Sequence, residues 1–291
     1  MYKRVHVIIN PASGQDRPIL GTLSRAFQES SIEWEIYITK KGGDARRFAE
    51  TALAAGADVV AVYGGDGTVA EVASALAGTE VPLAILPGGT ANVLSVELGI
   101  PKNLANACDL LCRENSRVQK IDLGRVGNSY FMLSTGIGFA AALIGGADRK
   151  TKLRFGMLAY FVAAVRALRA QIHARYQLTL DGKQIETDGV TCMIINCGNL
   201  GLPGVKMAQA INVTDGLLDV VVIRRADLGA IIAIIARVLL RGSFGPFEHW
   251  QAREITLRAE PAQDVQTDGD IVGKTPISAE IVSQALGVVV P

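Results

Sequence analysis

The sequence predicts two folded domains: a three-layer α/β domain built on a parallel sheet, followed by a β-rich, mostly antiparallel domain. In the first 122 residues, short apolar runs alternate with stretches of helical period, whereas from about Asp122 short strands separated by turns take over. A length of 291 residues with 49% hydrophobic residues is sufficient for two cores. We expect residues 1–122 to form the first domain and 123–282 the second, with 283–291 as a candidate for a return to the first.

Strands and helices are expected to alternate along the first domain. The expected strands are Val5–Asn10, Trp34–Thr39, Asp58–Tyr63 and Pro82–Leu86. The expected helices are Arg17–Ser30, Asp44–Ala55, Val69–Ala77 and Ala91–Leu98. This alternation is typical of a parallel sheet covered by helices on both faces. Because such sheets bind ligands beyond the carboxyl ends of their strands, the four loops that follow the strands should converge on one site.

The second domain is expected to be built from short strands joined by turns. These strands are Ser129–Leu133, Tyr176–Leu180, Val190–Asn196, Leu218–Ile223, Glu254–Arg258 and Ile277–Val282. Helical stretches at Thr151–Ala170 and Leu228–Leu240 interrupt them. The pairs Asp181-Gly182 and Asp215-Gly216 are typical of hairpin turns. Since no linker separates the two domains, a cleft between them is the expected place for a substrate.

Composition excludes several classes of function. The 29 basic and 28 acidic residues leave a formal charge of +1, which does not favour nucleic acid as a partner. The four cysteines contain no CxxC pair and the three histidines lie far apart, so neither a zinc site nor a disulfide framework is indicated. The apolar run at the N-terminus is too short for a signal peptide, so a cytoplasmic location is expected.

Two segments leave membrane contact open. No apolar run reaches the ~18 residues of a spanning helix, and the most apolar one, Leu228–Leu240, is interrupted by Arg237. It is either a buried helix or a segment lying on a membrane surface. Basic residues in 149–154 precede an apolar stretch at 155–162, which fits either a buried helix or attraction to anionic headgroups at the inner membrane face.

Three loops at the ends of predicted strands are rich in glycine: NPASG at 10–14, GGDGT at 64–68 and PGGTAN at 87–92. Without Cβ atoms, these backbones can approach an anion closely. The second and third loops lead into helices whose first N–H groups face the strand end, as phosphate sites require. One such loop could be a structural turn, but three at one edge of a sheet favour a phosphate ligand.

Asp66 adds a carboxylate to a loop that should hold phosphate. The two negative charges would repel each other unless a cation lay between them, and Mg²⁺ prefers oxygen ligands of this kind. The alternative is that Asp66 caps a helix beginning at Thr68, which could itself be the cap. Thr90 and Asn92 could likewise cap the helix that follows them. Binding and capping can coexist.

Together, these motifs resemble the diacylglycerol kinase catalytic family and its bacterial soluble lipid kinases, within the phosphofructokinase and NAD-kinase-like superfamily. GGDGT at 64–68 is shared with NAD kinases, whereas LPGGTAN at 86–92 and NPASG at 10–14 favour lipid kinases. DGLLDVVV at 215–222 and QTDGD at 266–270 match late family motifs in order, so the resemblance covers nearly the whole chain. It implies an ATP-dependent, Mg²⁺-requiring kinase that phosphorylates the hydroxyl of a diacylglycerol-like lipid.

The alternatives are NAD-kinase-like phosphorylation of a soluble alcohol and a catalytically weak, nucleotide-binding regulator. The lipid substrate would bring peripheral contact with a membrane. Neither the choice between a monomer and a homodimer nor the acyl-chain preference is decided by the residues.

The resemblance also implies roles for individual residues. The nucleotide-contacting positions would be Asn10, Pro11, Ser13, Gly14, Thr39, Gly64, Gly65, Asp66, Gly67, Thr68, Gly89, Thr90 and Asn92. Asp215 would be the side-chain ligand of a metal site completed by backbone carbonyls near Asn212 and Leu217. Asp66 and Asp215 would organise Mg²⁺ around ATP.

The last motif departs from the family pattern. Its third residue, Asp270, stands where relatives usually carry glutamate as the general base. The carboxylate is withdrawn by one methylene, and an error of about 1 Å in placement can cost on the order of a hundredfold in rate. Either the cleft closes further, or the neighbouring Asp268 shares the role, or activity is poor. Ala140 replaces an aspartate of relatives, so no site residue is expected in 136–144.

Overall fold

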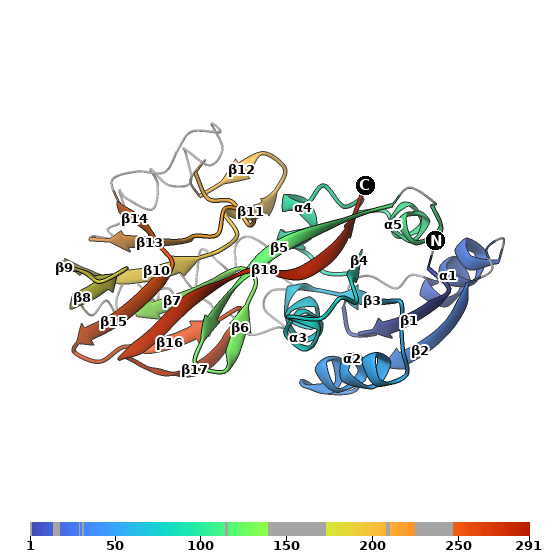
Figure 1. The fold of residues 1–291 in the computed structure, drawn as a ribbon, viewed down its shortest axis with the longest axis horizontal. Helices are drawn as coiled ribbons and strands as arrows, with labels where there is room; N and C mark the ends of the chain where they lie inside the picture. Colours follow the sequence, from blue (N-terminus) through green and yellow to red (C-terminus); the bar gives the residue numbers. More distant parts are fainter. Residues whose placement is uncertain are drawn as a thin grey trace. The chain divides into compact units, whose positions relative to one another are not determined.

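The structure, a computed structural model, forms two compact units (Figure 1). It describes residues 2–13, 18–28, 30, 32–113, 116–138, 173–207, 210–224 and 247–291. Unit 1 comprises Met1–Leu123, Asn199–Val205 and Val282–Pro291. Unit 2 comprises Gly124–Gly198 and Lys206–Ile281. Strand β18 (Ile277–Val290) therefore begins in unit 2 and ends in unit 1.

Unit 1 contains the predicted parallel sheet. Its strand order is β2 (Glu33–Ile38), β1 (Arg4–Ile9), β3 (Val59–Gly64), β4 (Leu83–Pro87) and the end of β18 (Figure 1). All residues of β3 and β4 are buried, which explains why these strands read as continuous apolar runs. Val288 of β18 pairs in parallel with Leu83 of β4, so the C-terminal residues extend this sheet.

Helices cover both faces of the sheet in unit 1, which confirms the three-layer prediction. They are α1 (Ile19–Phe27), α2 (Asp44–Ala54), α3 (Asp66–Leu76), α4 (Val93–Glu97) and α5 (Leu104–Cys112). α2 packs beside α3, and α1 beside α5 (Figure 1). α5 was not predicted, although Asn103 before the apolar residues of this helix was a usable signal: its Oδ1 accepts from the Asn106 N–H at 3.2 Å.

Two helix starts differ from the prediction. α3 begins at Asp66, inside the GGDGT motif, with Gly65 as its N-cap, and not at Val69. α4 begins at Val93, because Asn92 before it has a left-handed backbone (φ 48°) that a right-handed helix does not tolerate. Both glycine-rich loops therefore lead into their helices directly, without intervening turns.

Unit 2 is mostly antiparallel, as predicted. One sheet has the order β14 (Glu248–Ala252), β13 (Leu218–Ile223), β10 (Thr191–Ile195), β7 (Ser134–Gly138), β16 (Asp264–Thr267) and β17 (Asp270–Lys274). Antiparallel pairing also joins β18 to β15 (Glu254–Glu260), β15 to β8 (Ala174–Leu180) and β8 to β9 (Lys183–Gly189). β5 (Arg117–Val126) pairs with β6 (Ser129–Phe131). β11 (Asn199–Leu202), which belongs to unit 1, pairs with β12 (Val205–Lys206). One apolar core joins residues of β8 and β15, such as Tyr176 and Leu257, to residues of β10 and β13, such as Ile194 and Val220.

The predicted hairpins have different outcomes. Asp181-Gly182 joins β8 to β9 with positive φ at both residues, as a two-residue hairpin turn requires. The prediction for Asp215-Gly216 is wrong: this pair precedes β13, whose partners are β10 and β14, so it joins no paired strands. Asp268-Gly269 instead joins β16 to β17. An Asp-Gly pair signals a turn locally, but a hairpin also needs two strands that pair.

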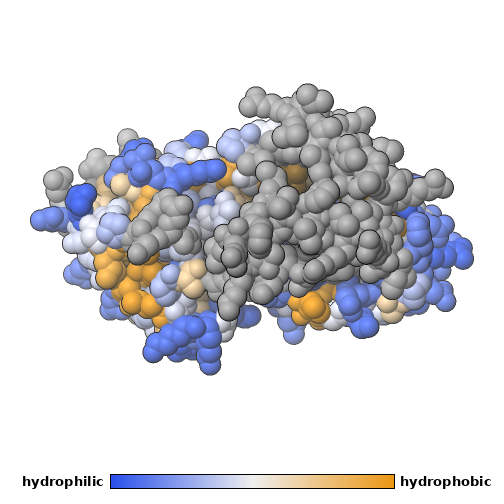
Figure 2. All heavy atoms as spheres, turned by 180° about the vertical axis from the view of Figure 1, so that it is seen from behind, coloured by the Kyte–Doolittle hydropathy of each residue, from blue (hydrophilic) through white to orange (hydrophobic). Residues whose placement is uncertain are grey.

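Expected helices at 151–170 and 228–240 and the membrane-contact residues at 149–162 lie outside the described residues. Within the described ranges, no helix combines the length and apolar character needed to cross a bilayer. On the face shown in Figure 2, apolar patches lie among polar residues. The large apolar side chains that are exposed in the described part of the chain are Leu20, Ile38, Val118, Leu200, Ile271 and Val272.

Gly124 is required by the packing of the β5–β6 pair. It lies directly opposite Phe131, and a Cβ added to it would come within 2.0 Å of the ring. We therefore expect Gly124→Ala to lower the free energy of unfolding by roughly 1–3 kcal/mol through overpacking. Denaturant titration would measure this, and Gly124→Ala/Phe131→Leu should lose less than the sum of the two single changes. Equal stability of Gly124→Ala and wild type would contradict this packing argument.

Candidate functional site

The first two glycine-rich loops of unit 1 are hydrogen-bonded to each other. The Nδ2 group of Asn10 donates to Oγ1 of Thr68 at 2.8 Å, and the N–H of Gly65 donates to Oγ of Ser13 at 3.3 Å. Asn10 also shapes its own loop, because its Oδ1 accepts from the Ala12 N–H at 3.0 Å. The loops after β1 and β3 therefore converge, as the order of a parallel sheet leads one to expect.

The second and third loops approach each other through their backbones. The N–H of Gly88 donates to the carbonyl oxygen of Gly64 at 2.9 Å. A Cβ added to Gly89 would lie 2.6 Å from the Cα of Gly65, and one added to Gly64 would lie 2.6 Å from the Cβ of Thr68. Gly89 is therefore needed for packing between the second and third loops, and Gly64 for packing within the second. In contrast, a Cβ on Gly67 would have no neighbour within 4 Å.

Asp66 links the second loop to the helix that follows the third. Its Oδ1 accepts from the N–H of Val93, the first residue of α4, at 2.7 Å. The interpretation that Asp66 caps a helix beginning at Thr68 is thus wrong, because α3 already includes Asp66 and the carboxylate bonds to the neighbouring helix. Burial raises the pKa of Asp66, while the backbone N–H groups of Val93, Asn92, Asp66 itself and Leu94 oppose this rise.

Asn92 closes the third loop on itself and does not cap α4 with its side chain. Its Oδ1 accepts from the Gly89 N–H at 3.0 Å, and its Nδ2 donates to the Gly89 carbonyl oxygen at 2.7 Å. The carbonyl oxygen and the NH₂ group of this buried side chain are therefore both hydrogen-bonded to Gly89, three residues earlier. Thr90 lies exposed between them.

The loop after β2 is held by Thr39, a predicted site residue, and by Glu71, which was not predicted. Thr39 is buried, and its N–H donates to the carbonyl oxygen of Ile9 at 2.9 Å, beside the first glycine-rich loop. Further along, Glu71 of α3 accepts from the N–H groups of Gly43 and Ala45, each at 3.0 Å. Gly43 is the N-cap of α2 and has no side chain to cap it, which was the available signal for an acceptor from elsewhere.

Asp44 completes the loop after β2. Its carboxylate accepts from the N–H groups of Lys40 at 2.9 Å and Lys41 at 3.1 Å, and from the Arg47 guanidinium at 2.9 Å. These contacts, with the Lys40 N–H as the largest contribution and the Arg47 hydrogen bond next, lower the pKa of Asp44 to about 2. The carboxylate is therefore ionised wherever the loop has this conformation.

An apolar hollow adjoins these loops. It has a volume of about 440 Å³ and is lined by Ile9, Pro11, Pro18, Ile19, Leu20, Gly21 and Ile38. Pro11 is one of the predicted nucleotide positions, and Ile9 and Ile38 end strands whose next residues are Asn10 and Thr39. An apolar wall thus stands beside the loops that carry the polar groups. Gly14 lies outside the described residues.

A segment that is distant in sequence also belongs to unit 1. β11 packs against α4, and Gly201, with φ +80°, would place a Cβ 3.1 Å from the Cβ of Ala91. The side chain of Asn199 is buried, and its Oδ1 accepts from the Gly201 N–H at 2.8 Å. No local pattern indicated that residues 199–205 would join the third glycine-rich loop.

In unit 2, the predicted metal-binding turn is shaped by its own side chains. Asn212 Oδ1 accepts from the Thr214 N–H at 3.2 Å, and Asp215 Oδ1 accepts from the Leu217 N–H at 3.0 Å. Carboxylate and carbonyl oxygens are hard donors that suit Mg²⁺. Among the described residues, no group of three or more His, Cys, Asp or Glu side chains could hold a metal. Asp215 is the one carboxylate of the predicted set, whose other members are backbone carbonyls.

The two aspartates of the last motif lie in different environments. Asp268 accepts from the N–H groups of Met132 at 2.7 Å and of Leu133 and Ser134 at 3.0 Å. Asp270 is the exposed first residue of β17. Ala140, where no site residue was expected, lies outside the described residues.

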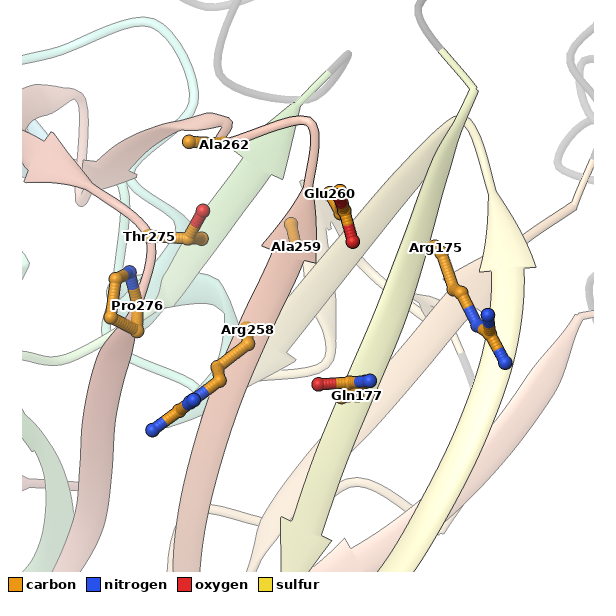
Figure 3. A pocket seen from close by; sticks show the side chains of 8 residues that line it. All are labelled: Arg175, Gln177, Arg258, Ala259, Glu260, Ala262, Thr275 and Pro276. Carbon is orange, nitrogen blue, oxygen red and sulfur yellow. The ribbon is translucent and has the colours of Figure 1, made fainter.

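A polar hollow elsewhere in unit 2 contains none of the predicted site residues. Its volume is about 450 Å³ and it is lined by Arg175, Gln177, Arg258, Ala259, Glu260, Ala262, Thr275 and Pro276. The guanidinium groups of Arg175 and Arg258 point away from each other (Figure 3). Arg175 also pairs with Glu186 at 2.5 Å. The hollow therefore offers no convergent charge for an anionic ligand.

Two family models match the chain. Residues 4–126 match the diacylglycerol kinase catalytic domain. Residues 133–290 match the YegS C-terminal NAD kinase beta sandwich-like domain. The two matches follow each other along nearly the whole sequence. The first match contains the three glycine-rich loops, and the second contains most of the antiparallel strands.

Individual relatives agree with the family models. The chain is 33% identical over 249 residues to a Pseudomonas putida protein named "Probable lipid kinase YegS-like", covering 84% of this chain and 81% of that protein. It is 27% identical over 282 residues to a Bacillus subtilis diacylglycerol kinase, covering 94% and 92%. A crystal structure of a diacylglycerol kinase from Bacillus anthracis superimposes with a TM-score of 0.80 at 28% identity, covering 100% and 97% of the two chains.

A substitution at Gly67 can distinguish a role in ligand binding from a role in packing. Because its Cβ position is open and it lies within α3, Gly67→Ala should leave the free energy of unfolding unchanged or raise it by up to about 1 kcal/mol. If the triphosphate lies against this backbone, the added methyl should raise the Kd for ATP about tenfold or more. Calorimetry and thermal unfolding would measure both. Gly89→Ala is the contrasting variant and should destabilise the fold; unchanged ATP affinity in Gly67→Ala would remove Gly67 from the site.

Asp44 makes a pH-dependent contribution to stability. Its pKa is lowered from an ordinary value of 3.8 to about 2, so its contribution is fully present above the ordinary value and is lost as the pH falls through about 2. We expect Asp44→Asn to be less stable at neutral pH and to lose less stability than wild type on acidification. Denaturant titrations between pH 5 and about pH 2 test this. Glu50→Gln, an exposed carboxylate of the same helix, is the control, and parallel curves for Asp44→Asn and wild type would refute the effect.

Proposed function

Because this chain belongs to the family of diacylglycerol kinases and YegS-like lipid kinases, and is a kinase, we propose that it transfers the γ-phosphoryl group of ATP to the hydroxyl of a diacylglycerol-like lipid. The observation that carries the proposal is the joining of three glycine-rich loops at one edge of a parallel sheet by Asn10, Thr68 and Asp66. Its acceptor lies in a bilayer, so the enzyme would work at a membrane surface.

The proposed nucleotide site combines a phosphate cradle with an apolar wall. The N-terminus of α3, which carries partial positive charge, and the open backbone at Gly67 would receive the phosphates. The hollow lined by Ile9, Leu20 and Ile38 offers apolar surface for the adenine ring of ATP. Both features belong to unit 1 and adjoin the same loops.

Asp215, with the carbonyl oxygens of Asn212 and Leu217, is the proposed Mg²⁺-binding set. When bound, this ion would neutralise charge on the phosphates during transfer. Burial raises the pKa of Asp66, and a cation at the phosphates would oppose this rise by favouring the ionised carboxylate. Held by the Val93 N–H, this carboxylate has a defined orientation before any ligand binds.

Asp270 is the proposed general base. As the acceptor oxygen bonds to the γ-phosphorus, the bond from that phosphorus to the bridging oxygen of ADP breaks, and the hydroxyl proton passes to the Asp270 carboxylate. Asp270 is exposed to an incoming substrate, whereas the oxygens of Asp268 accept three backbone N–H groups. The structure therefore favours Asp270 over Asp268 for this role.

A comparison of acceptors with labelled ATP tests the proposed reaction. Diacylglycerol in mixed micelles, other lipid alcohols and NAD would be offered to the same preparation with Mg²⁺. We expect transfer to diacylglycerol or a related lipid. Transfer to NAD alone would establish the soluble-alcohol alternative, and ATP binding without transfer to any acceptor would establish the regulator.

Asp270→Asn and Asp66→Ala test the assigned groups. Loss of the base should lower kcat by roughly 10²- to 10⁴-fold without changing the Kd for ATP. Asp66→Ala should abolish most turnover and weaken the Mg²⁺ dependence of ATP binding. Thermal unfolding checks that each variant is folded, and Asp270→Glu shows whether a longer reach raises kcat. Near-normal rates in Asp270→Asn and Asp66→Ala would remove both roles.

A further inference from the structure

We propose that Asp268 is a positioning residue: it does not share proton transfer with Asp270 but holds the turn that carries Asp270 against residues 132–134. The inference rests on the proposed role of Asp270 as the base. It assigns a different function to Asp268, which is to fix the position of the Asp270 carboxylate.

Four hydrogen bonds join Asp268 to one stretch of backbone. Its Oδ2 accepts from the Met132 N–H at 2.7 Å, and its Oδ1 accepts from the N–H groups of Leu133 and Ser134 at 3.0 Å. Its own N–H donates to the Ser134 carbonyl oxygen at 3.0 Å. Four hydrogen bonds thus extend the pairing of β16 with β7 beyond the last paired residues, Thr267 and Thr135.

This set of partners makes Asp268 a poor proton acceptor. A carboxylate that accepts three N–H groups is stabilised as the charged, acceptor-only form. A proton on this group would remove the negative charge that strengthens the three hydrogen bonds. Proton transfer to Asp268 would therefore weaken the contacts that hold the turn, whereas transfer to Asp270 would leave them intact.

The turn itself depends on side-chain contacts on each side. Asp268 (φ 46°) and Gly269 (φ 109°) both have positive φ, a conformation that costs energy at a non-glycine residue. Gln266 Nε2 donates to the Gly269 carbonyl oxygen at 2.7 Å. The hydroxyl groups of the buried Thr267 and Thr135 lie 3.2 Å apart. These bonds hold the turn in a conformation that the backbone alone would not favour.

Packing alone would leave Asp270 poorly placed. Among the described strands, β17 lies at the edge of its sheet, every residue in it is exposed, and its register with β16 shifts between Val265 and Gln266. An aspartate base also reaches one methylene less far than a glutamate, so its position depends more on its backbone. Because misplacement by about 1 Å costs on the order of a hundredfold in rate, an anchor immediately before the base has a direct effect on kcat.

Asp181 provides a matched control. It also has a positive φ (48°), also precedes a glycine in a two-residue hairpin, and also accepts two backbone N–H groups of a neighbouring strand, from Arg253 at 2.9 Å and Glu254 at 2.8 Å. It is exposed, in the same unit, and has no place in the proposed site. Asp181→Ala should therefore remove the same kind of turn-anchoring hydrogen bonds as Asp268→Ala, without the proposed loss of kcat.

The test compares Asp268→Ala, Asp268→Asn and Asp181→Ala in the full chain. We expect similar falls in thermal stability, but a loss of kcat of at least tenfold only in the Asp268 variants, with the KM for ATP changed less than twofold. The acidic limb of the pH–rate profile should persist in Asp268→Ala. In Asp268→Ala/Asp270→Asn, kcat should be no lower than in Asp270→Asn alone, because Asp268 acts only through Asp270. Asp268→Asn keeps one acceptor oxygen and serves if the alanine variant does not fold.

Three results would overturn the inference. These are a wild-type kcat in a folded Asp268→Ala variant, losses that multiply in the double variant, and disappearance of the acidic limb in Asp268→Ala. Hydrogen exchange of the Met132, Leu133 and Ser134 amides gives a readout independent of activity, and it should accelerate in Asp268→Ala. If wild type phosphorylates no alcohol, the proposed function fails by itself; unchanged exchange at these amides would refute the anchor whatever the activity.

Discussion

The candidate nucleotide site depends on polar contacts made by the first two turns of α3. Thr68 accepts from Asn10 of the first loop, Asp66 accepts from Val93 after the third, and Glu71 accepts from Gly43 and Ala45 after β2. The contacts of Asn10 with Thr68 and of Val93 with Asp66 are partly buried, so they replace hydrogen bonds to water that these groups lose on folding. The loops are thus held by one helix before any ligand arrives, and donors that are already oriented cost little reorganisation when charge develops.

The glycine residues of the motifs do not share one role. At Gly64 a Cβ would collide with Thr68 of the same loop, and at Gly89 it would collide with the Cα of Gly65 in the second loop, so both glycines are required by packing. Gly67 has open space instead, which leaves its backbone accessible from outside. Tightly packed backbone and accessible backbone therefore alternate within a few residues. A glycine-rich motif is a packing requirement as much as a binding one.

The sheet of unit 1 was predictable because its strands are buried on both faces and read as apolar runs; the four predicted strands lie within one residue of β1 to β4. The three glycine-rich loops followed from the same alternation. Contacts such as Glu71 with Gly43, or Asp268 with Met132, join residues far apart in sequence and leave no periodic signal. β17 was missed because an exposed edge strand has no apolar alternation to detect.

The two Asp-Gly hairpins of unit 2 share one local arrangement but differ in what the turn leads to. In both, an aspartate with positive φ fastens a turn to the backbone of a neighbouring strand. The turn at Asp181 precedes no proposed site residue, so its contact contributes to stability alone. The turn at Asp268 leads into β17, whose first residue is Asp270 and whose residues are all exposed. In the proposed mechanism, a shorter base on an exposed strand would need a fixed backbone, and the Asp268 carboxylate would supply that constraint.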